Sequence, residues 1–364
     1  MKCKLSDICS FRKGKISVAG LNRITYISTE NMLPNKCGIT ESSSLPTVQL
    51  TQEYKKGDVL VSNIRPYFKK IWKAKYDGGC SNDVLVFAAN SNTDKDFLYY
   101  ILANDDFFAY SMATSKGTKM PRGDKTSIMQ YEVPVMDVEL QRRIASILKS
   151  IDEKIELNNA INNNLEQQVS ALYQSWFEDF DPTNGVCPDN WSNQMLSTIA
   201  DISSGKRPPI KSEVYSQETP ISIVGAASVM GFTSEANHTD KILVTGRVGT
   251  HGVIQRFNTP CWTSDNTLVI TSPFYEFTNQ ILHRIDYSSM NRGSTQPLIT
   301  QGDMKKVVVL VPDEETLAKF EALAGSLMAQ WETNNNENVK LASLRDTLLP
   351  KLMSGELDVS DINI

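Results

Sequence analysis

The chain has 364 residues, of which 40% are hydrophobic and 22% charged, and its net charge at pH 7 is −5. This is the composition of an ordinary soluble globular protein. No apolar run approaches the roughly 18 residues that a membrane span needs, and the first residues lack the apolar region of a secretory signal. The six cysteines are scattered without a CxxC pair. We therefore expect free thiols, no membrane partner and a cytoplasmic location.

The negative charge is concentrated in a few segments. Residues 137–179 and 313–349 each carry a net charge of −4, and the tail 350–364 carries −2. The rest of the chain therefore carries +5, so the net charge of the whole chain does not exclude an anionic polymer as a partner.

The first 135 residues have the pattern of an α+β domain. Short β-branched runs such as 58–62 and 81–87 are separated by Gly, Asn and Asp turns and predict strands and hairpins. A helical stretch is predicted over 96–113.

A heptad pattern then runs from Ile144 to Trp176, with apolar residues stepping by four and three. The two exceptions, Asn158 and Asn162, are adjacent positions of the seam. The pattern predicts one long helix after Pro134, with Asp137 as its N-cap. At about 1.5 Å per residue this helix is roughly 60 Å long.

The segment 178–191 is rich in Asp, Pro, Gly and Asn and predicts a boundary, after which the chain repeats itself. "KLSDICSFRKGK" aligns with "MLSTIADISSGKR", "DVLVSNIRP" (58–66) with "KILVTGRVG" (241–249), and "SNDVLVF" with "SDNTLVI". A second α+β domain with the same skeleton is expected.

The long helix is repeated too. A shift of 176 positions places Asn158 and Asn162 on Asn334 and Asn338, and Asp137 on Asp313. Buried asparagines in a seam cost stability but fix register, so we predict that the two helices pair with each other. The predicted pairing residues are Ile144, Leu148, Ile151, Ile155, Asn158, Asn162, Leu165, Phe320, Leu327, Trp331, Asn334, Asn338 and Leu341.

Two other interpretations of this pattern stay open. One such stripe alone is more typical of a core helix, and the asparagines could lie at a solvated gap or contact a partner protein. The second seam has Ala324 and Arg345 where the first has Leu148 and Val169. We therefore expect looser packing there, or contact with a partner.

No catalytic constellation stands out. The sequence has no GxxxxGK[ST] phosphate loop, and its three histidines form no HExxH motif or cysteine-containing ligand set. "RVGTHG" lacks the strand and helix context of a dinucleotide site. We predict no catalytic residues, no metal and no cofactor.

Basic segments on loops point to nucleic acid instead. Residues 54–76 carry seven basic side chains and one acid, with aromatic residues interleaved, and 115–125 carry four and one. Lysine suits phosphate contacts, whereas arginine and glutamine suit the reading of base edges. The predicted DNA contacts are Lys13, Arg65, Lys69, Lys116, Lys119, Lys206, Arg207, Arg247, Arg292 and Gln296.

At this point the sequence resembles the specificity subunit of Type I restriction-modification systems, over essentially its whole length. "VPVMDVELQRRIASILKSIDEKIELNN" resembles the entry into that family's first long helix, and "LYQSWFEDFDP" its exit. "CPDNW" followed by "LSTIADISSGK" resembles the opening of a second target-recognition domain, and "LRDTLLPKLMSGEL" the close of the second helix.

The resemblance implies an α+β fold with two tandem-duplicated target-recognition domains separated by two long helices, which form an antiparallel coiled coil. The domains implied are target-recognition domain 1 at 1–135, the first spacer helix at 136–179, a linker at 180–194, target-recognition domain 2 at 195–312, the second spacer helix at 313–349 and a tail at 350–364.

The resemblance also implies the function. Each globular domain would read one half of an interrupted site in double-stranded DNA. The helices would dock two adenine-N6 methyltransferase subunits, and the full complex would add motor-nuclease subunits. Catalysis, S-adenosylmethionine and ATP would then belong to those partners, and this chain would be a non-catalytic recognition subunit.

Three alternatives to DNA recognition within such a complex stay open. The chain could be a coiled-coil scaffold whose basic loops bind proteins, an enzyme acting on DNA by itself, or a helical dimerisation module unrelated to DNA. For the first, a steep salt dependence of DNA binding would support phosphate contacts, and a flat one would remove DNA recognition. For the last, Asn158→Leu and Asn334→Leu should alter the oligomeric state without any effect on DNA. Cleavage or methyl transfer by the purified chain alone would establish the second.

Overall fold

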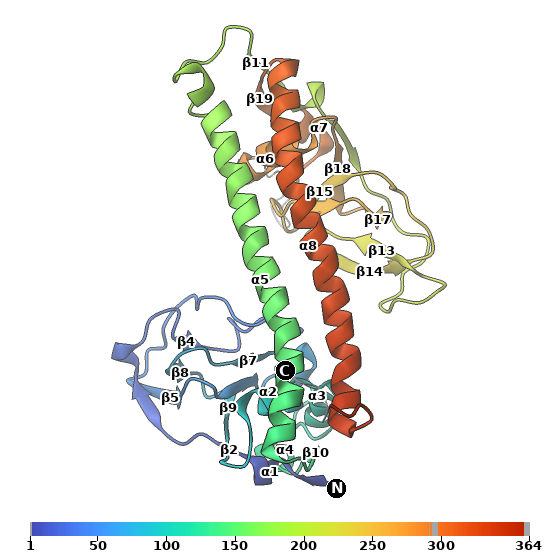
Figure 1. Ribbon diagram of the computed structural model, residues 1–364. Coiled ribbons are helices and arrows are strands. Elements are labelled where there is room, and N and C mark those ends of the chain that lie inside the picture. Colours follow the sequence, from blue (N-terminus) through green and yellow to red (C-terminus); the bar gives the residue numbers. More distant parts are fainter. Residues whose placement is uncertain (1, 291, 293–297, 360–364) are drawn as a thin grey trace. The chain divides into compact units, whose positions relative to one another are not determined.

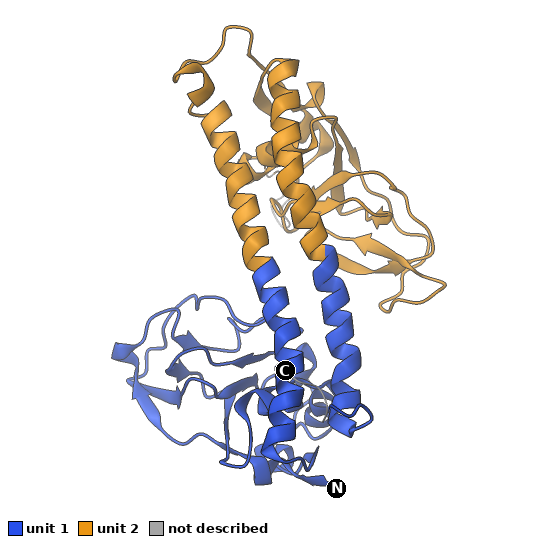
Figure 2. Cartoon of the chain, in the orientation of Figure 1, with its two compact units in different colours: residues 1–158, 336–364 blue, residues 159–335 orange. Residues whose placement is uncertain are grey.

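The computed structural model divides the chain into two compact units (Figure 2). Unit 1 comprises residues 1–158 and 336–364, and unit 2 comprises residues 159–335. The residues that the structure describes are 2–290, 292 and 298–359. Over these residues, no helix combines the length and apolarity that crossing a membrane requires.

Two long helices (Figure 1) each pass from one unit into the other (Figure 2). Helix α5 spans Val138–Phe177 and α8 spans Glu314–Ser354. In unit 1 the first half of α5 shares a core with the last half of α8, and in unit 2 the last half of α5 shares a core with the first half of α8. The helices therefore run antiparallel. Together with the sheets below, this confirms the predicted α+β fold of duplicated domains and paired helices.

Unit 1 contains two four-stranded sheets among its described residues, ordered β2-β9-β6-β7 and β3-β5-β8-β4, and a separate pair β1-β10. The first sheet lies between two apolar clusters. One face packs against the helices of the unit, and the other face packs against the second sheet. The strands are β1 (Lys2–Lys4), β2 (Cys9–Phe11), β3 (Lys15–Ser17), β4 (Tyr26–Ile27), β5 (Leu50–Tyr54), β6 (Val59–Ser62), β7 (Ile71–Lys73), β8 (Gly78–Cys80), β9 (Val84–Ala89) and β10 (Glu132–Pro134).

The short helices of unit 1 are α1 (Leu5–Ile8), α2 (Lys95–Ala103), α3 (Asp105–Ala113) and α4 (Lys125–Ile128). The helical stretch predicted over 96–113 is therefore two helices. Asn104 separates them: its backbone is extended, and its side chain accepts a hydrogen bond from the Asp106 N–H, which caps α3.

Unit 2 repeats this plan with sheets β12-β18-β15-β16 and β14-β13-β17 and the pair β11-β19, counted over its described residues. Its strands are β11 (Ser192–Met195), β12 (Asp201–Ser204), β13 (Ile221–Val224), β14 (Val229–Thr233), β15 (Ile242–Gly246), β16 (Gln255–Phe257), β17 (Cys261–Thr263), β18 (Thr267–Thr271) and β19 (Val308–Val311). Its short helices are α6 (Tyr275–Arg284) and α7 (Gln301–Lys305). β11 begins inside the segment 180–194 that was predicted as linker.

The register of the strands confirms the duplication residue by residue. Cys3 pairs with Val133 in unit 1, and Gln194 pairs with Val309 in unit 2. The first member of the pair is shifted by 191 positions and the second by the same 176 positions that relate the two helices. The duplication therefore includes strand pairing as well as sequence.

The alignment proposed above for the strand β6 is wrong by one residue. Val59 pairs with Phe87, and its counterpart, Leu243, pairs with Ile270, so β15 is shifted by 184 positions and not by 183. Val59 and Leu243 both face the helices of their units. A slip of one residue would turn each side chain of the strand to the opposite face of the sheet.

Both long helices begin as predicted. Asp137 accepts a hydrogen bond from the Leu140 N–H at 2.8 Å, and Asp313 accepts one from the Thr316 N–H at 3.0 Å. These carboxylates satisfy N–H groups that the first turn of a helix leaves without partners, and their charge suits its positive end.

The end of the second helix differs from the prediction. α8 continues through Pro350 to Ser354, five residues beyond the predicted end at 349. Proline inside a helix removes one hydrogen bond and normally ends it. Here Leu349, Leu352 and Met353 are buried in the core of unit 1, and this burial offsets the lost bond.

Leu352→Ala should therefore destabilise unit 1 by about 2–4 kcal/mol, because the side chain is buried and its removal leaves a cavity. Chemical denaturation followed by far-UV circular dichroism would measure the change. Leu344→Ala on the same helix is the control, since Leu344 is 47% exposed and should change stability by less than about 0.5 kcal/mol. Equal effects of the two variants would contradict the packing described for the end of α8.

Candidate nucleic-acid interface

Two of the basic segments predicted to contact DNA meet in unit 1. The Arg65 N–H donates to the Pro121 carbonyl at 2.8 Å, and Ile64 forms a β-bridge with Arg122. Arg122 also bridges to Lys116. The structure therefore brings Arg65 and the loop carrying Lys116 and Lys119 into one junction of two loops.

Unit 2 contains the same kind of junction. The Ile299 N–H donates to the Arg247 carbonyl at 3.0 Å, and Val248 forms a β-bridge with Leu298. The Arg292 N–H donates to the Leu298 carbonyl at 3.1 Å, so Arg247 and Arg292 belong to one junction. Gln296 lies outside the described residues.

The two junctions are equivalent in their backbone bonds. The Asn63 N–H donates to the Asp83 carbonyl at 2.8 Å, and the Arg247 N–H donates to the Asn266 carbonyl at 2.8 Å. The Asn63 carbonyl accepts from Gly123 at 3.2 Å, as Arg247 accepts from Ile299. Asn63 and Arg247 therefore occupy the same position. The sequence alignment missed this match because of the one-residue slip in β6.

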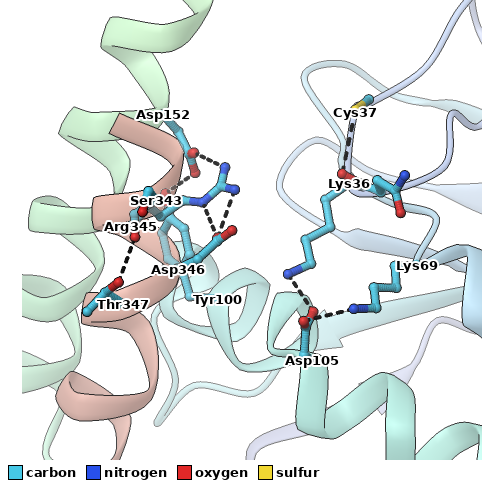
Figure 3. A network of polar contacts seen from close by, with 11 residues as sticks. Lys36, Cys37, Lys69, Tyr100, Asp105, Asp152, Ser343, Arg345, Asp346 and Thr347 are labelled. Carbon is cyan, nitrogen blue, oxygen red and sulfur yellow. Dashed lines mark hydrogen bonds and ion pairs between the residues drawn. The ribbon is translucent and has the colours of Figure 1, made fainter. Parts of the chain in front are cut away.

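Several of the predicted contact residues are already paired with carboxylates. Lys69 Nζ lies 2.8 Å from Asp105, which also binds Lys36 (Figure 3). Lys116 Nζ lies 2.6 Å from Asp124, and this hydrogen bond lowers the pKa of Asp124 to about 2. These acids are therefore ionised at neutral pH and compete with phosphates for the two lysines.

Arg292 is paired in the same way, with Asp303. The pKa of Asp303 is lowered mainly by the Thr300 hydroxyl, with Arg292 contributing. Asp303 and Thr300 also form the capping box of α7, so this acid is held by its own helix.

The remaining candidates have no ion pair with any described residue. Arg65 and Arg247 are partly exposed, and the Nε of each is shielded from solvent without a hydrogen-bond partner. Four others have exposed side chains: Lys13, Lys119, Lys206 and Arg207. The Lys206 N–H donates to the Thr263 carbonyl at 2.9 Å.

The helix seam contains a layer of amides in each unit. In unit 1, Asn158 donates to Asn338 Oδ1 at 2.9 Å and to Glu337 at 2.8 Å. In unit 2, Asn334 donates to Asn162 Oδ1 at 2.8 Å, and Asn162 donates to Asn335 at 3.0 Å. Each predicted asparagine thus contacts the opposite helix.

None of the predicted pairing residues is exposed. Eight positions are buried: Ile144, Leu148, Ile151, Asn158, Asn162, Leu165, Phe320 and Asn334. Five are partly buried: Ile155, Leu327, Trp331, Asn338 and Leu341.

The expectation of loose packing at Ala324 and Arg345 is wrong, whereas the alternative, contact with a partner, stays a prediction. Ala324 is fully buried in the core of unit 2. Arg345 binds Asp152 of α5 at 2.8 Å, and the Tyr100 hydroxyl donates to the same carboxylate (Figure 3). Burial disfavours the charge of Arg345, but the bond to Asp152 outweighs it and the pKa of Arg345 is raised. A charged pair replaces the apolar contact that the first copy has at this position.

Among the described residues, no group of three or more His, Cys, Asp or Glu side chains is placed to hold a metal ion. All six cysteines are free thiols. Burial raises the pKa of Cys9 and Cys80 to about 12, so neither thiol is ionised at neutral pH.

Comparison with known proteins gives consistent matches. Residues 1–167 match the family model described as "Type I restriction modification DNA specificity domain". The chain is 24% identical to the specificity subunit of the Type I restriction enzyme HindI of Haemophilus influenzae, over 97% of this chain and 98% of that protein. It is 25% identical to the MjaIX specificity subunit of Methanocaldococcus jannaschii, over 73% and 70%.

A solved structure shares the fold. The crystal structure of the S subunit of a Type I restriction-modification system from M. genitalium superposes with a TM-score of 0.56 at 18% identity, covering 99% of this chain and 96% of that chain. At 18% identity, this similarity shows a shared fold and no more.

The amide layer of unit 2 predicts a coupled pair of mutations. Asn334→Leu alone should cost about 1–3 kcal/mol, because the buried Asn162 loses its donor. Asn162→Leu combined with Asn334→Leu should cost less than the two single changes added together, by about 0.5–3 kcal/mol. Denaturant unfolding of the four proteins in the cycle measures this difference. Asn163→Leu is the control, because Asn163 is exposed on the same helix. Additive costs would show that the two asparagines do not interact.

Proposed function

We propose that this chain is a specificity subunit of a Type I restriction-modification system and that it supplies DNA recognition to such a complex. Residues 1–135 and 195–312 are the proposed target-recognition domains, and each reads one half of an interrupted double-stranded site. The segments 136–179 and 313–349 are the proposed spacer helices. The chemistry belongs to the partner subunits.

The observation that carries this proposal is the equivalent loop junction in the two units. Both junctions have the same backbone bonds at Asn63 and Arg247, yet their side chains differ. Phosphate contacts supply affinity without sequence information, whereas different side chains at one position discriminate bases. Two related scaffolds with different side chains are what an asymmetric two-part DNA site requires.

The helices are the proposed docking surface for the methyltransferase subunits. Apart from the seam, α5 and α8 carry large apolar side chains that are exposed in this chain: Leu157, Ile161, Leu323, Val339 and Leu344. Exposed apolar residues of this size on a helix are suited to packing against further helices. We propose two methyltransferase subunits, with motor-nuclease subunits in the complete assembly.

Domain exchange tests the two-reader model. The chain is co-expressed with a methyltransferase subunit of its system, and methylated adenines are mapped across the host genome. We expect an interrupted two-part motif. Replacement of residues 1–135 by those of another specificity subunit should change one half and leave the other unchanged. A change in both halves, or an uninterrupted motif, would contradict the model.

The exposed lysines should contribute affinity without specificity. Lys119→Ala or Lys206→Ala should weaken binding to all duplexes about equally and reduce the slope of log K against log salt by about one unit, since each removes one phosphate contact. Titration of the complex with labelled duplex at several salt concentrations measures the slope. Lys340→Ala, on the exposed face of α8, should leave the slope unchanged. A slope insensitive to both loop lysines would remove them from the interface.

A further inference from the structure

Arg65 has a backbone conformation for which its counterpart in unit 2 uses glycine. Its φ and ψ are 51° and 66°, in the left-handed region. The shift of 184 positions that relates β6 to β15 places Arg65 on Gly249, whose φ is 84°. This region is unfavourable for a residue with a Cβ atom, and Pro66 restricts the preceding residue further. The arginine is therefore present at a cost to the fold that glycine would avoid.

Among the described residues, the Arg65 side chain has no hydrogen-bond or ion-pair partner that would offset this cost. Its Nε is shielded without a hydrogen-bond partner, and the guanidinium forms no ion pair with a described residue. The basic neighbours of Arg65, in contrast, are paired with acids: Arg122 Nη2 lies 3.3 Å from Asp83, and Lys116 is bound to Asp124. A partly buried guanidinium without acceptors is unfavourable until a ligand supplies them.

Backbone hydrogen bonds fix the turn from which the Arg65 side chain projects. The Arg65 N–H donates to Pro121, and its carbonyl accepts from the Phe68 N–H at 3.0 Å. The carbonyl of Phe68 accepts in turn from the Asn35 N–H at 2.8 Å. A fixed backbone reduces the entropy lost on binding and suits a planar donor that must meet two acceptors at once. Guanine presents such a pair, O6 and N7, in the major groove.

We propose that Arg65 is a specificity-determining residue of the first domain and that it reads a guanine in the half-site of that domain. This inference rests on the proposed function. The strained backbone is then the cost of placing an arginine where recognition needs it, in keeping with the general occurrence of backbone strain at functional sites.

Three variants separate recognition from folding. Arg65→Gly removes the side chain and introduces glycine, the residue that unit 2 has at the equivalent position, Gly249. Its melting temperature should stay within about 2 °C of the wild-type value or exceed it, because relief of strain balances the greater freedom of the unfolded chain. Arg65→Lys keeps the charge but cannot form the bidentate contact. Arg122→Lys is the control from the same junction.

The variants are assayed as complexes with the methyltransferase subunit, on duplexes that differ at single positions of the mapped site. For Arg65→Gly and Arg65→Lys, we expect discrimination at one G·C pair of the first half to fall by about 5- to 150-fold, with the second half unaffected. Arg122→Lys should preserve both halves.

Three results would overturn the inference: a first half without a G·C pair, unchanged discrimination in Arg65→Lys, or a melting temperature of Arg65→Gly lowered by more than about 4 °C. The second would identify a phosphate contact, and the third a structural role. If the wild-type complex methylated no two-part motif, the proposed function itself would fail. If the wild-type complex methylated such a motif and Arg65→Gly did not change it, only the inference about Arg65 would fail.

Discussion

The core of each unit is closed by part of α5 and part of α8, and the rest of the structure depends on this sharing. In unit 1, Leu148 of α5 and Leu352 of α8 belong to one apolar cluster, although about two hundred residues separate them in sequence. Unit 1 therefore cannot complete its core from one continuous stretch of chain. The last turns of α8 must pack against the first domain of the chain, and the antiparallel course of the helices brings them there.

The amides in the seam restrict how the helices can meet. An apolar seam alone tolerates a shift by one heptad, because leucine and isoleucine pack acceptably in several registers. With Asn158 opposite Asn338 and Asn162 opposite Asn334, a shifted pairing would leave buried amides without partners, at a cost of about 1–3 kcal/mol each. The shift of 176 positions makes Asn334 the copy of Asn158 and Asn338 the copy of Asn162. Each asparagine therefore pairs with the copy of the other one, as expected when two copies of one helix run antiparallel. Register is thereby fixed at the cost of some stability, and we propose that this register sets the spacing between the DNA half-sites.

The sequence predicted the large-scale features of this fold because they are periodic. The heptads, the capping residues Asp137 and Asp313 and the shift of 176 positions were all visible in it. The register of β6 was not, since alternation of period two fits either of two neighbouring alignments and the shared letters "LV" favoured the wrong one. The continuation of α8 past Pro350 was also missed, because it depends on burial of Leu352 against residues distant in sequence. For the proposed interface, the sequence supplied the basic residues but could not show that Asp105 and Asp124 neutralise two of them.

We propose that the length of the helix pair sets the spacing of the two DNA half-sites, and lengthening both helices tests this proposal most directly. One heptad is inserted between Asn158 and Asn162 of α5 and one between Asn334 and Asn338 of α8, which preserves the seam. Methylated adenines are then mapped in cells that also express the methyltransferase subunit. Seven residues add about 10 Å, so we expect unchanged half-sites separated by about three more base pairs. An unchanged gap between the half-sites would contradict it.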